Sequence, residues 1–306
     1  MIGFSIQSPV FLSDFRRHTH HDLIGNCEHI DQFLEILKEN GVKSIEVRIL
    51  PRNVDDEAYI KVIQQIWKAG LQITIHGHVE GEMEGSRFED IYPSMRTILR
   101  QFDHYQTDLM MAVHAFDAKE GSEEELMHRT IQLFKQWTSM AATENIPIRF
   151  ALENNRKKMT KVDPGDTTEG IVKMVEIIDS PLMGITWDTG HYYSDLIKSI
   201  ENSHLQGQTC MTLPNRTFLE KVIHTHIHGI VNLGTHQPLT TKESLPLEYY
   251  VENLQTLNYR GIYNLELTMP KFKNSDRTIL EHVSASIKRL HTSLQQSHSD
   301  EKHVSY

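Results

Sequence analysis

Polar residues of metal-binding type follow short apolar runs at intervals along the chain. In chain order they are His76, His114, Glu153, Asp188, His226 and Glu266. Imidazole nitrogens and carboxylate oxygens both bind divalent transition metals. A single residue of this kind at a strand end often only caps a helix or binds a loop, but six in succession indicate a shared metal site. The mixed ligand set suits Mn²⁺ or Zn²⁺, with Co²⁺, Fe²⁺ or Mg²⁺ as alternatives, better than Ca²⁺, which prefers oxygen alone.

The most informative of these runs is the stretch GITWDTGH, from Gly184 to His191. It predicts a buried strand that ends at Asp188, then a turn at Gly190, with His191 presented three residues after the acid. An Asp and a His delivered together at a strand end can form half of a metal site. The alternative is an Asp that accepts backbone hydrogen bonds beside a surface histidine.

Short apolar runs alternate with helical stripes along the whole chain. The expected strands are residues 2–6, 44–49, 71–75, 109–113, 148–152, 184–188, 222–228 and 262–265. Helices are expected between them. One of these begins at Ser122, which has capping-box spacing to Glu125.

Strand and helix units that alternate in this way predict an α/β fold with a parallel sheet. Eight units without a composition break are most simply a closed (β/α)8 TIM barrel. We expect a single domain over residues 1–295 and a polar tail at 296–306. An open doubly wound sheet is the alternative, but the glycine-rich turn that it usually carries after its first strand is missing.

The carboxyl ends of all strands of such a barrel meet on one face, where active sites lie. The metal-binding residues named first all stand at expected strand ends, so we expect them to converge. On the strand 222–228, the period of two also places His224, His226 and His228 on one face.

Other residues near the strand ends have two interpretations each. Arg48 could contact a substrate oxygen or phosphate, or form an ion pair within the fold. Trp187 could line the site or belong to the core. The glycine-rich, acidic loop 77–85 could be a mobile lid or an ordinary long loop.

Composition limits the function classes. The 306-residue chain has a formal net charge of −10, which argues against a general nucleic-acid binder, because such proteins neutralise phosphates with clustered Lys and Arg. Its two cysteines, Cys27 and Cys210, cannot form a disulfide framework and indicate a reducing, cytoplasmic compartment. Neither a leader nor a membrane-spanning apolar run is evident. The expected insertion at 192–221 is a candidate homodimer interface.

At the strand ends the sequence resembles the xylose isomerase-like barrel superfamily, which includes sugar isomerases and epimerases, inosose dehydratases and the endonuclease IV group. The matching stretches are residues 74–76, 112–114, 151–154, 187–191, 224–226 and 265–266. The resemblance implies a metal held by Glu153, Asp188, His226 and Glu266, with His191 nearby. In epimerase-like members the two glutamates also act as an acid/base pair across the substrate carbon, while the metal steadies enediolate oxygens.

The activity that this resemblance implies is a metal-dependent isomerase or epimerase of a small sugar or polyol derivative. A proton would move at a carbon next to a metal-bound carbonyl, Glu153 and Glu266 would be ligands and proton carriers, and His191 would orient a substrate oxygen. After His226, however, sugar enzymes of the family commonly carry Lys-Asp, or a Glu followed by a substrate-binding Arg. The residues here are Ile227-His-Gly229 and then Asn232, which leaves the substrate open.

An endonuclease IV-like phosphodiester hydrolase is the alternative. Its members add His76 and His114 to Glu153 for a second metal, and use His191 with an Asp-x-His pair for a third. His236 could be the last of these, or a substrate-binding residue, but Gly234 stands where the aspartate is expected. A barrel that has lost catalysis and serves as a binding or scaffold protein is a third interpretation, against which the complete ligand set argues.

Overall fold

The structure is a computed structural model that describes residues 1–6, 30–49, 56–79, 109–201, 211–239, 245–272 and 277–299. Parallel strands close into a barrel in the order β1-β10-β7-β6-β5-β4-β3-β2. Their bounds are β1 (Ile2–Ile6), β2 (Ser44–Arg48), β3 (Gln72–His76), β4 (Leu109–His114), β5 (Ile148–Glu153), β6 (Met183–Asp188), β7 (Val222–Ile227) and β10 (Ile262–Leu265). This confirms the predicted (β/α)8 barrel.

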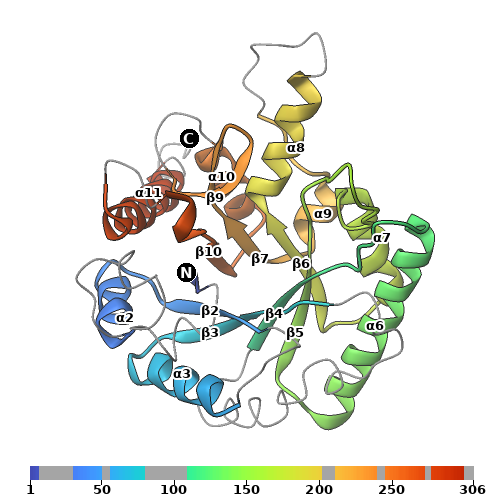
Figure 1. The fold of residues 1–306 in the computed structure, drawn as a ribbon, viewed down its shortest axis with the longest axis horizontal. Coiled ribbons are helices and arrows are strands. Elements are labelled where there is room, and N and C mark those ends of the chain that lie inside the picture. Colours follow the sequence, from blue (N-terminus) through green and yellow to red (C-terminus); the bar gives the residue numbers. More distant parts are fainter. Residues whose placement is uncertain are drawn as a thin grey trace, which may run out of the picture.

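Helices surround the barrel (Figure 1) because each carries an apolar stripe that packs on the outer face of the strands. They are α2 (Ile30–Glu39), α3 (Asp56–Lys68), α6 (Glu123–Glu144), α7 (Thr168–Ile178), α8 (Thr189–Glu201), α9 (Arg216–Glu220), α10 (Leu247–Thr256) and α11 (Ile279–Ser299). Among the described residues, no helix is both long enough and apolar enough to cross a membrane.

Side-chain caps fix where the helices begin. The Oγ of Ser122 accepts a hydrogen bond from the backbone N–H of Glu125 at 3.1 Å, so the serine half of the predicted capping box is present. Thr167 caps α7 in the same way through Gly170. The last helix runs to Ser299, so residues 296–299 of the expected tail are helical, while the division of the chain at 295 stays a prediction.

The segment after β6 differs from the prediction. No glycine turn follows Asp188, because α8 begins at Thr189 and contains both Gly190 and His191. A Cβ atom at position 190 would overlap the ring of His228, so glycine is needed here for close approach rather than for a turn. The expected insertion at 192–221 contains the rest of α8 and all of α9.

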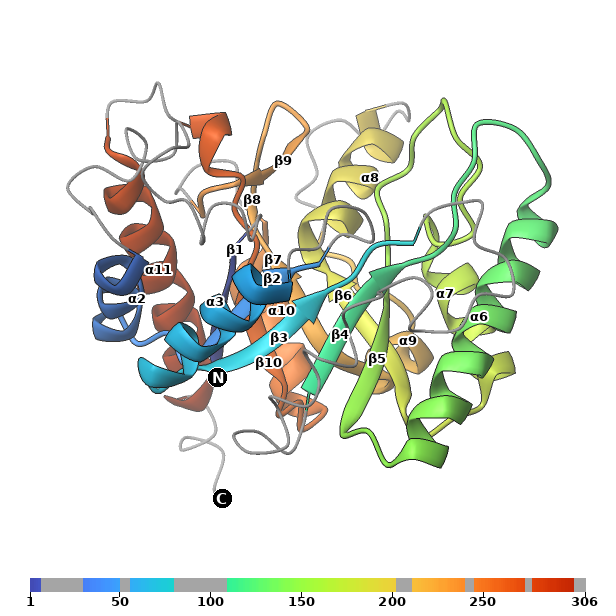
Figure 2. The same ribbon diagram turned by 60° about the horizontal axis from the view of Figure 1, so that its bottom comes forward.

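A β-hairpin that the sequence did not indicate follows β7. Its strands are β8 (Gly229–Val231) and β9 (Gly234–Gln237), which pair antiparallel. Asn232 and Leu233 both have positive φ, of 49° and 62°, as a tight two-residue hairpin turn requires. Figure 2 shows the hairpin and the 3-10 helix η1 (Met269–Phe272) at the same end of the barrel.

Several predicted features lie outside the described residues. These are loop positions 80–85, insertion residues 202–210, tail residues 300–306, Cys27 and Cys210.

We expect Gly190→Ala to destabilise the chain, because its added methyl group would overlap the buried His228 ring. Overpacking of this kind costs roughly 1–3 kcal/mol of unfolding free energy, to be measured by urea unfolding. Ser199→Ala, at an exposed position of the same helix, is the matched control and should leave stability unchanged or slightly higher. Equal stability of both variants would show that the chain accommodates a side chain at 190.

Candidate metal centre

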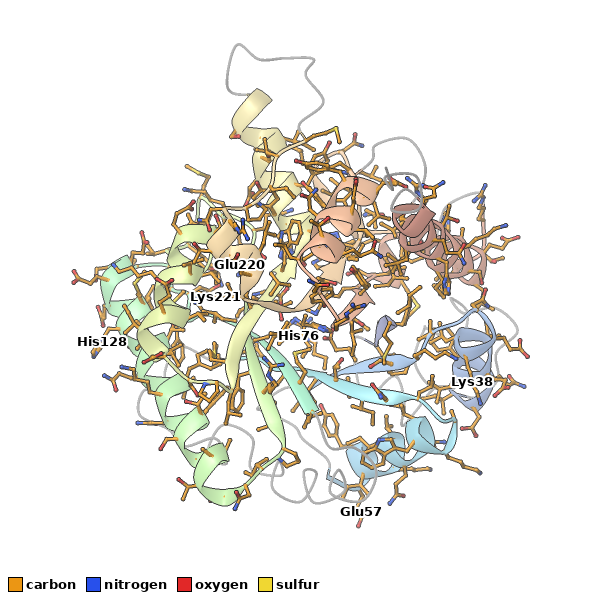
Figure 3. The ribbon with its side chains drawn as sticks, turned by 180° about the vertical axis from the view of Figure 1, so that it is seen from behind. Lys38, Glu57, His76, His128, Glu220 and Lys221 are labelled. Carbon is orange, nitrogen blue, oxygen red and sulfur yellow. The ribbon has the colours of Figure 1, made fainter. Side chains whose placement is uncertain are left out.

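All six strand-end residues singled out in the sequence come together at one end of the barrel. Ligand atoms of His76, Glu153, His226 and Glu266 all lie within 4.8 Å of one another, and so do those of Glu153, Asp188 and His191. The Nε2 of His114 lies 3.7 Å from Glu153 Oε2. In Figure 3, His76 lies in the middle of the ring of strands, whereas Lys38 and His128 lie at its outside.

Two glutamates converge on the Nδ1 of His226. Glu153 Oε1 lies 2.8 Å away and Glu266 Oε2 3.4 Å away. The ring of His76 stacks on that of His226 with centroids 5.4 Å apart, and its Nε2 lies 3.4 Å from Glu153 Oε2. The two carboxylates reach this point from β5 and from the residue after β10, which are separated in the barrel by β6 and β7.

The donor set fits a divalent metal ion. Glu153 Oε2 and Glu266 Oε2 are buried and have no hydrogen-bond partner. Buried polar atoms are normally satisfied, so two buried carboxylate oxygens without partners beside imidazole nitrogens fit the binding of a divalent cation.

Burial and neighbouring charges push the pKa values of the two glutamates apart. Burial raises the pKa of Glu153 to about 8, against the lowering effect of His226. Burial would also raise the pKa of Glu266. The nearby His236, His226 and His76 outweigh this effect and lower the pKa of Glu266 to about 2. Burial alone would lower the pKa of His226, but the charges of Glu153, Glu46 and Glu266 outweigh it. The pKa of His226 is therefore raised well above its ordinary value. Without a metal, the proton between these groups therefore resides on His226 or Glu153, and Glu266 is ionised.

Asp188 is held by Asn154, the residue directly after β5, and by His191 on α8. Asn154 and Asp188 exchange hydrogen bonds, from Asn154 Nδ2 to Asp188 O at 2.9 Å and from Asp188 N to Asn154 Oδ1 at 2.8 Å. The backbone N–H of His191 donates to Asp188 Oδ1 at 2.6 Å. Asp188 therefore does accept a backbone hydrogen bond, but His191 is buried at 6% exposure and is not a surface residue.

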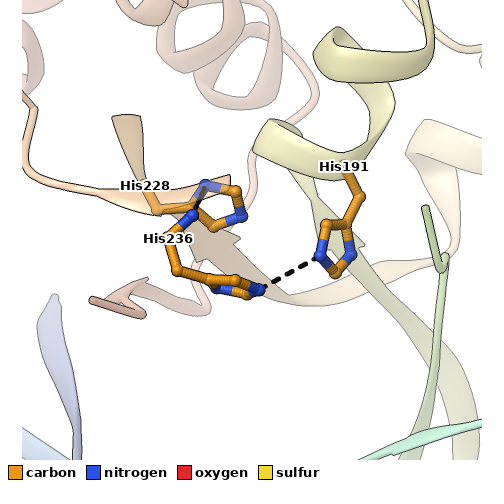
Figure 4. Close-up of side chains that lie close together, drawn as sticks. All are labelled: His191, His228 and His236. Carbon is orange, nitrogen blue, oxygen red and sulfur yellow. Dashed lines mark hydrogen bonds between the residues drawn. The ribbon is translucent and has the colours of Figure 1, made fainter. Parts of the chain in front are cut away.

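His228 is a buried partner of Asp188 that the sequence placed on the right face but did not assign to the site. Its Nε2 lies 3.0 Å from Asp188 Oδ1, and its Nδ1 lies 2.9 Å from the backbone N of His236 (Figure 4). A backbone N–H can only donate, so the Nδ1 of His228 accepts the hydrogen bond from His236. The ring proton is then on Nε2, which donates to Asp188. His228 therefore connects Asp188 to the β8–β9 hairpin.

His191 and His236 point at each other, with their Nε2 atoms 3.3 Å apart (Figure 4). The Nδ1 of His191 lies 3.3 Å from the carbonyl oxygen of Asn154, and that of His236 lies 3.3 Å from the carbonyl oxygen of Glu266. When both Nδ1 atoms donate to these carbonyls, the two Nε2 lone pairs face one another, whereas a hydrogen bond between the Nε2 atoms needs the other tautomer of one ring. Two nitrogens at about 2.1 Å from a tetrahedral zinc ion are about 3.4 Å apart, so this pair has the spacing of two metal ligands.

The hairpin that carries His236 is fixed by two cations. Arg156 Nη1 donates to Leu233 O at 3.2 Å, and Lys271 Nζ donates to Thr235 O at 2.9 Å. His236 itself has a φ of 59°, a conformation that non-glycine residues adopt at a cost. These contacts offset that cost and hold the imidazole of His236 toward the site.

The remaining candidates lie in different surroundings. Arg48 ends β2 beside His76. The pKa of His76 is lowered to about 4, first by burial and second by the positive charge of Arg48. Trp187 is fully buried against Tyr192 and Tyr250, with ring centroids 6.1 and 4.9 Å away, on the helix-covered side of the barrel. That position favours the core interpretation of Trp187.

Residues 34–290 match the family model described as the xylose isomerase-like TIM barrel. The chain belongs to this family. Solved structures with a similar fold include a D-tagatose 3-epimerase-like protein (TM-score 0.64, 17% identity, 97% of this chain and 98% of that chain). An L-ribulose 3-epimerase has TM-score 0.63 and 15% identity over 100% and 99% of the two chains. The D-psicose 3-epimerase of Clostridium cellulolyticum H10 has a TM-score of 0.61 and is 12% identical, over 95% of this chain and 99% of that chain.

A curated relative is an uncharacterized protein of Methanocaldococcus jannaschii. It is 37% identical over 75 residues, which is 23% of this chain and 27% of that protein's length. This match therefore adds nothing about activity.

We expect Lys271→Met to loosen the hairpin of this xylose isomerase-like barrel, because the donor to Thr235 O is lost. A partly exposed hydrogen bond of this kind contributes about 0.5–1.5 kcal/mol, so the amide of His236 should exchange with solvent about 2- to 10-fold faster. Hydrogen exchange measures this directly. Lys198→Met, which removes only the pairing with Asp195 on α8, should leave the rate unchanged. An unchanged rate in Lys271→Met would show that this contact does not hold the hairpin.

Proposed function

We propose that this chain is a divalent-metal-dependent isomerase or epimerase of a small sugar or polyol derivative. The observation that carries the proposal is the convergence of Glu153 and Glu266 on His226 Nδ1, with one buried oxygen of each left without a hydrogen-bond partner. The likeness in fold to solved sugar epimerases supports the proposal.

Glu153, Asp188, His226 and Glu266 would hold the metal. The ion would supply a positive charge that polarises a substrate carbonyl or hydroxyl and makes the adjacent carbon–hydrogen bond more acidic. The two glutamates approach the Nδ1 of His226 from different strands, Glu153 from β5 and Glu266 from the end of β10. From there, one carboxylate can remove a proton from a substrate carbon while the other returns one.

His191 is suited to orient a substrate oxygen. Its Nδ1–H is engaged with the carbonyl of Asn154, which leaves Nε2 free to accept a hydrogen bond from a substrate hydroxyl. His236 presents the same kind of acceptor from the hairpin. Two acceptors side by side suit a substrate with neighbouring hydroxyl groups, as polyols have.

Phosphodiester hydrolysis is the second candidate, favoured by one set of contacts. His76 and His114 both lie near Glu153 Oε2, at 3.4 and 3.7 Å, and His191 and His236 have the spacing of two ligands. More than one metal could therefore bind. The net charge of −10 and the glycine at 234 argue against a nucleic-acid substrate. The cytoplasmic location and the homodimer stay predictions.

Metal content per chain separates the two candidates. We expect about one Mn²⁺ or Zn²⁺ in the native protein by elemental analysis, lost in Glu153→Gln because that variant removes a charged ligand, and kept in His114→Ala. Two or more ions, with one lost in His114→Ala, would favour the hydrolase. No metal in the native protein would contradict both mechanisms.

Proton transfer by the two glutamates gives a direct test of activity. On a panel of ketoses and inososes in D₂O, the protein should exchange deuterium into the carbon next to the carbonyl. Because general acid–base catalysis contributes about 10²- to 10⁴-fold, Glu266→Gln should slow exchange by at least that factor, and Glu153→Gln, which is also expected to lose the metal, by more. The control, Lys198→Met, lies away from the site and should retain the native rate. Exchange at the native rate in either glutamine variant would remove that residue from the proposed pair.

A further inference from the structure

We propose that Glu46 is a positioning residue that fixes which nitrogen of His226 faces the metal. It holds the Nε2–H of His226, so that Nδ1 is the ligand. The metal-binding half of this inference rests on the proposed function, whereas the hydrogen bond to Glu46 does not.

The carboxylate of Glu46 is fully buried inside the barrel and is saturated with donors. Its Oε2 lies 3.0 Å from the Nε2 of both His224 and His226. Its Oε1 accepts from Ser5 Oγ at 2.6 Å and from Asn264 Nδ2 at 3.0 Å. A carboxylate with four donors is stable only as the ionised acceptor. Glu46 can therefore serve His226 only by receiving its Nε2 proton.

The other face of the same ring points at the metal centre. Nδ1 of His226 lies 2.8 Å from Glu153 Oε1 and 3.4 Å from Glu266 Oε2. In the metal-free chain a proton occupies this position, and a bound cation would take its place. A histidine that donates one ring N–H to a carboxylate has its tautomer and orientation fixed, and the opposite nitrogen becomes a better ligand.

Only barrel closure brings Glu46 to this position. Glu46 is on β2 and His226 on β7, 180 residues apart, and β1 and β10 lie between these strands in the ring. The alternation of β7 turns both His224 and His226 inward, with rings 5.2 Å apart and nearly perpendicular. His224 thus binds the same oxygen of Glu46, Oε2, as His226 does.

The first measurement locates the proton on the native chain. Long-range ¹H–¹⁵N correlation spectra of histidine-labelled, Zn²⁺-loaded protein, assigned with His226→Gln, should show His226 protonated at Nε2 and metallated at Nδ1. Metallation at Nε2 would overturn the proposal. In the metal-free chain a protonated Nε2 should also be present, and an unprotonated Nε2 there would overturn the Glu46 contact whether or not the protein binds metal.

The second measurement is the affinity for Mn²⁺ by titration calorimetry. Glu46→Gln should bind Mn²⁺ about 10- to 100-fold more weakly, as loss of a supporting carboxylate typically causes. Ser5→Ala removes a donor to Glu46 Oε1 and an acceptor for Asn264 Nδ2 but leaves Oε2 and its contact with His226 in place, so it should change the affinity less than threefold. Thermal unfolding without metal verifies that both variants fold. Native affinity in a folded Glu46→Gln variant would overturn the proposal. A native protein that binds no Mn²⁺ or Zn²⁺ would instead refute the proposed function, with the metal-free spectrum still deciding the contact to Glu46.

Discussion

The barrel interior must neutralise carboxylates that are almost completely removed from water. The residues Glu46, Glu153, Asp188 and Glu266 are 0–5% exposed. An ionised carboxylate transferred alone into such surroundings is strongly destabilising, so each needs donors or a cation. This constraint explains why so many imidazoles surround the site. Each buried histidine offers a nitrogen that can donate to a carboxylate without adding a flexible, fully solvated ammonium group.

The four carboxylates meet this requirement in two ways. Glu46 is satisfied by protein donors alone, and Asp188 is largely satisfied by His191 and His228. Glu153 and Glu266 each retain an oxygen without a hydrogen-bond partner. The unsatisfied oxygen of Glu153 lies 3.4 Å from His76 Nε2, and that of Glu266 lies 3.4 Å from His226 Nδ1. The polar interior thus divides into a part satisfied by protein donors and a part where a bound cation would lower the electrostatic cost of burial.

The positions of the strand-end residues could be predicted because parallel closure places all carboxyl ends on one face, whatever the loops do. The partners of these residues could not be predicted. Glu46 is 180 residues from His226, and no local pattern indicates a contact across a barrel. His224, His226 and His228 were placed on one face by their spacing, but which carboxylate each would meet depends on strand register. Gly190 was interpreted as a turn residue because its sequence does not show that the His228 ring lies against it.

The hairpin after β7 is formed by the stretch in which the sequence departs from the pattern of the family's sugar enzymes. Residues 227–229 lack the charged side chains expected after the ligand histidine, but the chain turns back instead and inserts His236 beside His191. Leu233 in the turn and His236 on β9 both have positive φ, and Arg156 and Lys271 donate to the carbonyls of Leu233 and Thr235. A backbone held in unfavourable conformations by several contacts is over-determined by its surroundings. The position of His236 therefore depends on the hairpin, whereas Glu153, Asp188 and His226 are held by the barrel strands themselves.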